Sequence, residues 1–372
     1  MQKKEKSKCV RAGQWLCAAL CMGILFGGML AHILMPDAAV SRQERRRLAS
    51  LPSWDAAAWR QGTLADRFER YAQEQFPLRS ALRTGKACVQ MGLLARKENH
   101  GVYLCAGQLY KPEARMSAAE IQKAADKFRE VAGKYLAGRR LYTCVVPDKS
   151  EFLAPAGQAA DSRAVEGILR EALGADFSHI EVRDLLGAEA YYRTDIHWAQ
   201  ERILPVAQRV ASAMGREVRA ADFAAVRAGE LYGSYYGQAA LPLAPDELWY
   251  LDSEAIRQMQ VYHLEGDRVS GVYDPKKALG EGSMDGYDLF LSGAEAFLRI
   301  DNPAGEGELV LFRDSFGSSL APLLAGSYAR VSIVDLRYIS TEALGQFLEV
   351  SPEADVLFLY STVTLNHASM LK

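Results

Sequence analysis

The region from residue 117 onward alternates β-rich segments with segments of helical period, and this alternation constrains the fold more than any other feature. The β-rich segments are residues 141–147, 179–186, 308–313, 329–336 and 354–360, and the main helical segments are 117–138, 162–174 and 318–328. Strands separated by helices favour a parallel sheet covered by helices on both faces. The sequence therefore predicts an α/β fold.

Residues 216–300 interrupt the alternation. They are rich in glycine, tyrosine and turn residues, which predicts an irregular, partly β insertion. Nearer the N-terminus, residues 64–94 have a helical pattern with a bend near Pro77, and residues 100–112 read as a short hairpin. We therefore expect one main domain over residues 64–372, with the insertion at 216–300.

The composition is that of an ordinary globular protein. Of the 372 residues, 49% are hydrophobic and 24% are charged, which excludes wholesale disorder. The formal net charge of −2 gives no electrostatic reason to expect nucleic-acid binding.

An uncharged apolar run from Trp15 to Met35 precedes the main domain. At about 1.5 Å per residue, a helix of this length crosses the roughly 30 Å apolar core of a bilayer. We predict a transmembrane anchor at 15–35, between a basic head at 1–14 and a juxtamembrane tether at 36–63. A cleaved signal peptide is the alternative, although its apolar region would be shorter.

The orientation of this anchor follows from the flanking charges. The basic head contains Lys3, Lys4, Lys6, Lys8 and Arg11, which favours a cytoplasmic N-terminus. Arg42, Arg45, Arg46 and Arg47 follow the apolar run and weaken that preference. We expect the main domain on the outer side of the cytoplasmic membrane.

The cysteines do not form a recognisable framework. Outside the anchor region, Cys88, Cys105 and Cys144 are odd in number and widely spaced, which fits neither a set of disulfides nor a CxxC metal site. The chain also has no phosphate loop and no dinucleotide fingerprint. We expect no metal and no cofactor.

A serine follows one of the predicted strands. In LFRDSFGSSLAPLL, Asp314 and Ser315 lie between the strand 308–313 and a helix. This order puts a hydroxyl at the carboxyl edge of a parallel sheet, where the helix N-terminus can hold an oxyanion. The alternative is that either residue simply caps the helix.

Asp195 and His197 form the second polar cluster, in YYRTDIHWAQ after the predicted strand 179–186. In an extended backbone, side chains two positions apart lie on the same face, so the carboxylate could orient the imidazole. Together with Ser315 they make a candidate Ser-His-Asp set, since the serine needs a base and the base needs an orienting partner. A buried histidine satisfied by one aspartate is the alternative.

Further residues could surround this set. Tyr232, Tyr235 and Tyr236 could form a surface that stacks on a substrate or bonds its hydroxyl groups, or they could pack in the core. Lys149 ends a strand and could bind an anionic substrate group or be solvated. Arg337 could support the site through a carboxylate such as Asp314, or form a structural ion pair.

TDIHW at 194–198 resembles the motif of the DHHW protein family, which is similar to the alginate O-acetyltransferase-like branch of SGNH hydrolases. The resemblance extends over ERRRLASLP, YAQEQFPLRSAL, VVPDKS, LYGSYYG, PDELWY, YDLFL and FRDSFGSSLAPLLAGSYARVSIVDLRYI. It implies an SGNH-like fold in which the D-x-H pair precedes the serine. Ile196 stands where the family name has a second histidine, RDSF replaces GDS, and no clear G-x-N-D block is present. The second oxyanion donor is therefore unidentified; the N–H of Ser315 or an amide of LYGSYYG could serve.

The same resemblance implies a function. Ser315 would be the nucleophile, His197 the general base and acid, and Asp195 its orienter, in O-acyl transfer (most simply O-acetyl) to cell-surface polysaccharide. It also implies a multi-spanning membrane O-acyltransferase as partner. Two alternatives stay open: a carbohydrate esterase, and a non-catalytic glycan-binding or scaffold protein of the cell envelope.

Overall fold

The computed structural model describes residues 2–113, 115–159, 161–264 and 268–372, with side chains from residue 13 onward. Its centre is an eight-stranded sheet in the order β11-β10-β12-β14-β13-β15-β6-β7. The strands of this sheet are β6 (Arg140–Val146), β7 (Phe177–His179), β10 (Gln260–His263), β11 (Val269–Ser270), β12 (Phe297–Asp301), β13 (Glu308–Arg313), β14 (Arg330–Val334) and β15 (Asp355–Ser361).

The sheet is mixed but mostly parallel. Strands β14, β13, β15, β6 and β7 pair in parallel, whereas β12, β10 and β11 add at one edge in antiparallel order. The α/β prediction is therefore confirmed. The stretch 216–300 is more regular than expected, because it supplies β10, β11 and most of β12 to the main sheet.

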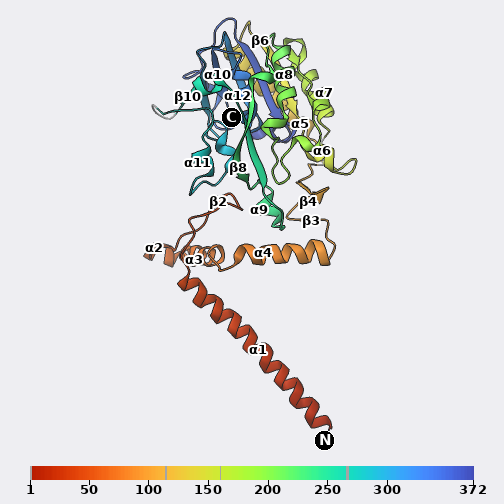
Figure 1. Ribbon diagram of the computed structural model, residues 1–372, viewed down its shortest axis with the longest axis vertical. Coiled ribbons are helices and arrows are strands. Elements are labelled where there is room, and N and C mark those ends of the chain that lie inside the picture. The colour runs from red at the N-terminus through yellow and green to blue at the C-terminus, as the bar shows by residue number, and fades with distance from the viewer. Residues whose placement is uncertain (1, 114, 160, 265–267) are drawn as a thin grey trace.

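Helices cover both faces of the sheet (Figure 1). Along β13, Leu309 and Leu311 pack on one face with α8 (Leu204–Ala213) and α12 (Phe316–Ala325). Val310 and Phe312 pack on the other face with α5 (Ala118–Tyr135) and α7 (Ser162–Leu173). Because β13 is buried on both faces, all six of its residues are buried, which explains its unbroken apolar run.

Smaller elements surround this core. The remaining helices and turns of the main body are α6 (Ser150–Leu153), η2 (Gly174–Asp176), η3 (Arg183–Leu185), η4 (Ala188–Ala190), η5 (Gln200–Arg202), η6 (Ala220–Asp222), α9 (Tyr236–Ala239), α10 (Glu254–Gln258), α11 (Pro275–Leu279), η7 (Gly286–Leu289), α13 (Thr341–Leu344), α14 (Thr362–Asn366) and η8 (Ala368–Met370). Two small antiparallel sheets join β3 (Glu98–Asn99), β4 (Val102–Cys105) and β5 (Gln108–Tyr110), and β8 (Ala224–Leu231) with β9 (Asp246–Asp252).

The N-terminal part lies outside the α/β body (Figure 1). It consists of α1 (Gln2–Leu34), the two-stranded β1 (Val40–Ser41) and β2 (Arg46–Arg47), α2 (Ala56–Arg60), α3 (Thr63–Glu74), α4 (Arg79–Cys88) and the π-helix η1 (Val89–Leu93). Within α1, Gly13–Leu34 has a mean hydropathy of 2.0 and is long and apolar enough to cross a membrane. The expected break near Pro77 separates α3 from α4.

One predicted strand was too long. Residues 179–186 were expected to be extended, but β7 ends at His179 and the 3₁₀ turn η3 follows. Ile180 and Val182 are both buried in the core and Glu181 between them is exposed, so the side chains of this segment do alternate between core and solvent. It reflects packing of an irregular segment against the sheet, because pairing with β6 does not continue to Val182.

Candidate active site

Ser315 lies at the junction between β13 and α12, as the sequence predicted. β13 ends at Arg313, and α12 begins at Phe316 with Ser315 as its N-cap residue. The Asp314 carboxylate accepts hydrogen bonds from the N–H of Phe316 (3.1 Å) and of Ser361 (2.8 Å). Asp314 therefore satisfies one donor at the start of α12, and the Ser315 hydroxyl does not cap this helix and is left for another partner.

Asp195 and His197 come from a compact turn rather than from an extended strand. The turn is closed by a bridge between Tyr191 and Trp198. Asp195 Oδ1 accepts hydrogen bonds from the backbone N–H of His197 at 2.9 Å and from its Nδ1 at 2.5 Å. The expectation of two side chains on one face of an extended backbone was wrong, because the aspartate reaches its partner by folding the backbone back on itself.

The structure brings Ser315, His197 and Asp195 together although 118 residues separate the serine from the histidine. His197 Nε2 lies 2.7 Å from Ser315 Oγ. An ionised carboxylate can only accept, so the bond to Asp195 assigns the ring proton to Nδ1 and leaves Nε2 as acceptor for the serine hydroxyl. Asp195 is fully buried, His197 is 6% exposed and Ser315 is partly exposed.

Asp195 has two further donors that sequence reasoning did not assign to the site. Arg45 Nη1 lies 2.7 Å from Oδ2, and the N–H of Ser234 donates to the same oxygen. Burial acts to raise the pKa of Asp195, but the charge and hydrogen bonds of His197, together with the charge of Arg45, hold that pKa well below its usual range. The carboxylate is therefore ionised at the pH of any cell.

Arg45 reaches the site from the segment that was expected to be a tether. Its second guanidinium nitrogen, Nη2, pairs with Asp285, and its φ of 52° lies in the left-handed region. We call residues 38–49 the strap. In the sequence, Arg45 was considered only as a charge that bears on membrane orientation. The one signal for a role at the site was its position in ERRRLASLP, a stretch that shares the family resemblance.

Tyr287 stacks on the imidazole of His197. The two ring centroids are 4.0 Å apart with an interplanar angle of 10°. The Tyr287 hydroxyl donates to Ser319 Oγ at 2.8 Å, which ties the tyrosine to α12. Burial raises the pKa of Tyr287, so the phenol stays protonated. Sequence reasoning noted this residue only as part of YDLFL.

Trp198 joins the two halves of the site. Its indole Nε1 donates to Ser319 Oγ at 2.8 Å and lies 3.1 Å from the carbonyl oxygen of Phe316. The fully buried ring thereby fixes the turn that carries His197 to the helix that follows Ser315.

Lys149 supports the turn and does not face a cavity. It is 0% exposed, and its Nζ donates to the carbonyl oxygens of Tyr192 (2.6 Å), Asp195 (3.0 Å) and Arg193 (3.3 Å). Burial lowers the pKa of Lys149 to about 8, although nearby carboxylates act in the opposite direction. The expectation that this lysine meets an anionic substrate group does not fit its position.

Arg337 likewise has a structural partner. Its Nε and Nη2 lie 2.9 and 2.6 Å from the two carboxylate oxygens of Asp335. It therefore forms the structural ion pair that the sequence left open, and its carboxylate partner is not Asp314.

The three tyrosines do not form one surface. Tyr235 is 5% exposed and lines a cavity beside the triad. Tyr236 donates to the carbonyl oxygen of Leu243 at 3.0 Å and packs edge-on against Tyr232, with centroids 5.0 Å apart. Only Tyr235 is placed to meet a ligand in this cavity.

The backbone amides near the site differ in whether they already have a hydrogen-bond partner. In LYGSYYG, the N–H groups of Gly233 and Tyr235 already bond to Thr194. The N–H of Ser234 bonds to Asp195, and the N–H of Tyr236 bonds to the carbonyl oxygen of Gly233. A Cβ on Gly233 would lie 2.2 Å from the Thr194 carbonyl oxygen, so only glycine permits this close approach. Within the described residues, the N–H of Ser315 at the start of α12 has no such partner.

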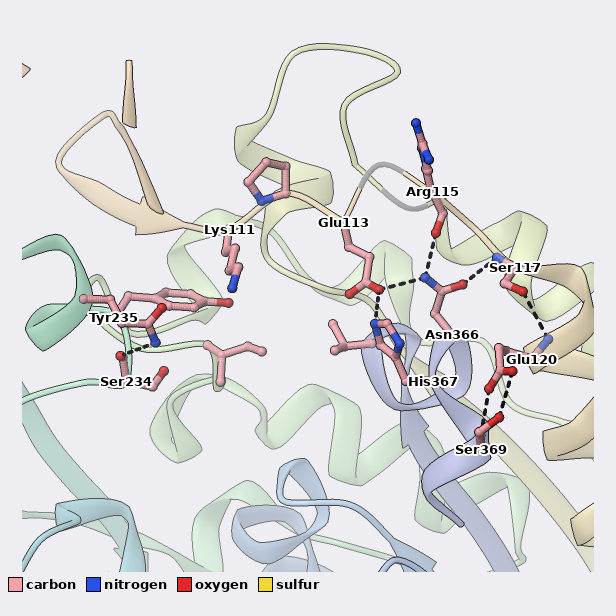
Figure 2. Close-up of a pocket in the computed structure, with 14 residues that line it drawn as sticks. Lys111, Glu113, Arg115, Ser117, Glu120, Ser234, Tyr235, Asn366, His367 and Ser369 are labelled. Atoms are coloured by element: carbon pink, nitrogen blue, oxygen red, sulfur yellow. Dashed lines mark hydrogen bonds and ion pairs between the residues drawn. The ribbon is translucent and has the colours of Figure 1, made fainter. Parts of the chain in front are cut away.

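A cavity of about 1030 Å³ borders the turn (Figure 2). Ile196 and Ser234 are among its lining residues, and Lys111, Glu113 and Arg115 line a wall that belongs to the segment after β5. Glu113 accepts from Asn366 and pairs with His367 at 2.6 Å, so this wall is held by the chain's C-terminal segment. The Ser315 hydroxyl is not itself part of the lining, so the cavity adjoins the triad from the side of the turn.

Among the described residues, no cluster of three or more His, Cys, Asp or Glu side chains could hold a metal ion.

Comparisons with solved structures support the fold. A DHHW family protein from Eubacterium siraeum superposes with a TM-score of 0.60 at 17% identity, covering 73% of this chain and 95% of that one. Bacillus cereus PatB1, solved with a sulfonyl adduct, gives 0.57 at 18% identity, covering 71% and 95%. The O-acetyltransferase domain of Pseudomonas putida AlgJ gives 0.42 at 14% identity, covering 72% and 92%, and is too remote to carry an argument.

No family model matches the chain, and no curated protein matches it. At 17–18% identity the likeness to solved structures concerns the fold alone. The resemblance that the motifs indicated is confirmed at that level: this chain is structurally similar to a DHHW family protein and to PatB1.

Proposed function

We propose that this protein is an SGNH-like O-acyltransferase that uses Ser315, His197 and Asp195. The observation that carries the proposal is the continuous hydrogen-bond chain from Ser315 Oγ through the His197 ring to Asp195, at 2.7 and 2.5 Å. A serine, a base with a fixed tautomer and a buried carboxylate are what nucleophilic acyl transfer requires.

In the first step, Ser315 Oγ forms a bond to the acyl carbonyl carbon while His197 Nε2 takes the hydroxyl proton. The carbonyl oxygen becomes an oxyanion at the N-terminus of α12, where the Ser315 N–H and the helix dipole stabilise it. The bond to the donor's leaving group then breaks, and His197 returns the proton to that group. An acyl-serine results.

In the second step, an acceptor hydroxyl loses its proton to His197 and attacks the acyl-serine, and Ser315 Oγ leaves with the proton. The cavity of about 1030 Å³ beside the turn is large enough for a carbohydrate acceptor, and Gln238, Asn366 and Ser369 in its lining can hydrogen-bond hydroxyl groups. We propose cell-surface polysaccharide as the acceptor class. Water in place of the sugar would make the same site an esterase.

The location of the protein belongs to the same proposal. The apolar helix Gly13–Leu34 would anchor the chain with its N-terminus inside and the α/β body outside the cytoplasmic membrane. An acyl donor would then have to cross the membrane, which is the role proposed for a multi-spanning membrane O-acyltransferase partner.

The direct test is covalent capture of the nucleophile. Incubation with an aryl acetate or a sulfonyl fluoride should add one acyl or sulfonyl group to the peptide that contains Ser315. The adduct should disappear in Ser315→Ala. In His197→Ala it should form at least about 100-fold more slowly, since general base catalysis contributes roughly that factor or more. Ser318→Ala, a buried serine one helical turn along α12, is the matched control.

Two results separate the alternatives. If Ser315→Ala, His197→Ala and Asp195→Ala all keep wild-type surface-polymer acylation, the enzyme proposal is wrong and a scaffold role is favoured. If the acyl-enzyme forms but its turnover is unaffected by added oligosaccharide, hydrolysis rather than transfer is the reaction.

A further inference from the structure

Apart from α1, exposed large apolar side chains are concentrated in one short segment of the described chain, between residues 50 and 95. Between residues 50 and 95 they are Leu51, Trp54, Trp59, Phe68, Phe76, Leu78, Leu82, Val89, Leu93 and Leu94. In the rest of the described chain after residue 94 they are scattered: Leu104, Met116, Val269, Met284, Tyr338, Phe347 and Met370. Soluble monomers rarely expose such dense apolar surface, so the first group requires an explanation.

The helix α4 and the segment η1 that continues it are amphipathic, but their apolar side is exposed. On a soluble domain, the apolar side of a helix faces the core. Its side toward the α/β body is partly charged: Arg79 pairs with Glu44, and Arg83 Nη2 donates to the carbonyl oxygen of Gly237 at 2.6 Å. Its other side carries Leu78, Leu82, Val89 and Leu93, which are 73%, 58%, 49% and 78% exposed. Leu82 lies in α4 and Val89 and Leu93 lie in η1, and their spacings of seven and four residues place them near one face, while Leu78 is the N-cap residue that precedes α4. We call these four residues the apolar face of α4.

The C-terminal end of α1 contacts the same region. His32 Nδ1 lies 3.1 Å from the carbonyl oxygen of Gln75, and its ring packs edge-on against Tyr71. Phe76 lies so close to Gly28 that a Cβ there would be 3.3 Å from the phenylalanine ring. Figure 1 shows the row of α2, α3 and α4 between α1 and the α/β body.

The contact between Phe76 and Gly28 fixes the position of Phe76 along α1. From Gly28 to the helix end at Leu34, α1 rises about 9 Å at 1.5 Å per residue. Amphipathic helices at a membrane surface bury their apolar face by about 5–10 Å. If α1 crosses a bilayer, the segment that starts at Phe76 therefore lies at the depth that such helices occupy.

The tryptophans fit the same location. Trp54 and Trp59 are 71% and 61% exposed and their rings lie 5.4 Å apart, just before α3. Tryptophan is enriched where a membrane protein meets the headgroup layer, because its ring is apolar and its N–H is polar.

We infer that α2–η1, residues 56–93, is a platform that lies in the surface of the lipid bilayer, with the apolar face of α4 in contact with acyl chains. The inference rests on the membrane anchor of the proposed function and adds a second, in-plane contact to it. Through Arg79, Arg83 and Glu44 the platform also holds the strap that carries Arg45 to Asp195. The bilayer surface and the triad are thereby connected through side-chain contacts.

The test uses the full chain in liposomes of phosphatidylcholine that contain a lipid with a photoreactive diazirine in its acyl chain. After irradiation, lipid adducts should map by mass spectrometry to α1 and to residues 78–93, and not to β8 or β9. The double substitution Leu82→Glu and Val89→Glu should reduce the adducts at 78–93 by about tenfold or more, since a carboxylate strongly resists transfer into hydrocarbon. Adducts on α1 should persist.

The matched control is Val269→Glu, because Val269 and Val89 are both 49% exposed. It should leave the adducts at 78–93 unchanged. Adducts on α1 without adducts at 78–93 would overturn the platform while leaving the anchor intact, and would favour a protein partner on this face. Adducts on neither would remove the anchor, and the platform with it.

Discussion

At the scale of single residues, Asp195 is the most heavily constrained side chain of the site. One oxygen accepts from the backbone and ring of His197, and the other accepts from Arg45 and from the N–H of Ser234. Every one of these contacts favours the ionised carboxylate. Arg45 differs from the backbone donors because it carries a charge, and that charge is one of the causes that lower the pKa of Asp195.

Replacing Arg45 by methionine should therefore change the pH dependence of the reaction. We expect Arg45→Met to lower kcat/KM for an acetyl ester by about tenfold, the loss of one charged hydrogen bond. The acid limb of the pH–rate profile should move to higher pH, because the charge of Arg45 is one cause of the lowered pKa of Asp195 and its removal makes that carboxylate easier to protonate. Arg45→Lys should restore most of the limb's position. A reduced rate with an unshifted limb would indicate a purely structural role.

Trp198 gives a prediction about stability. Trp198→Phe keeps the aromatic packing but removes the donor shared by Ser319 Oγ and the carbonyl of Phe316. The expected cost is about 1–3 kcal/mol of unfolding free energy, since a buried hydrogen bond is lost and the smaller ring leaves a void in the core. Denaturant titration measures it, and Trp249→Phe, at a partly exposed position, should change stability by about 0.5 kcal/mol or less. Equal effects of the two substitutions would contradict the assignment.

At the scale of elements, the strap decides whether Arg45 is present at the site. Glu44 anchors it: the carboxylate pairs with Arg46 and Arg83 at 2.9 and 2.7 Å and also with Arg79. Burial acts to raise the pKa of Glu44, but the hydrogen bonds of Arg79 and Arg46 and the charge of Arg83 outweigh it, so the pKa is lowered. Because docking of the strap lowers the pKa of Glu44, the ionised carboxylate stabilises the docked strap at pH values above 4.5, the ordinary pKa of the group.

Two consequences can be measured by amide hydrogen exchange of residues 38–49. In the wild type, protection of the strap should be full above pH 4.5 and should fall as the pH drops through the lower pKa of the docked state. Glu44→Gln should lose at least about tenfold of that protection at neutral pH, because three arginines lose their shared anion. Glu247→Gln, at an exposed carboxylate paired with Arg227, is the control. Unchanged exchange in Glu44→Gln would show that other contacts hold the strap.

At the scale of the whole molecule, stability at alkaline pH should reveal the buried ammonium of Lys149. Its pKa is about 8 in the folded chain against 10.5 ordinarily. Between these values the unfolded chain binds a proton that the folded chain does not, so stability rises with pH in this window. The difference in unfolding free energy, wild type minus Lys149→Met, should increase by up to about 1 kcal/mol per pH unit there.

Denaturant unfolding of the full chain in detergent at several pH values measures this difference. Lys276→Met, at an exposed lysine, should show no such trend against the wild type. A flat or falling difference for Lys149→Met would mean that the pKa of Lys149 is not lowered in the folded chain.

The sequence by itself determined the α/β class and the position of the serine. A strand buried on both faces must be apolar throughout, so ELVLFR was readable, and Ser315 had to follow it at the sheet edge. It also determined the apolar N-terminal helix and the pairing of Asp195 with His197, because these are local patterns of charge and spacing.

Only the tertiary structure decided what lies around those residues. Arg45 and Tyr287 reach His197 or Asp195 from distant segments, and Lys149 turned inward to three backbone carbonyls. Which arginine of the strap meets Asp195, and which apolar face of α4 stays uncovered, depend on how separate elements pack. That packing depends on contacts between residues far apart in the chain, and local propensity and periodicity carry no record of such contacts.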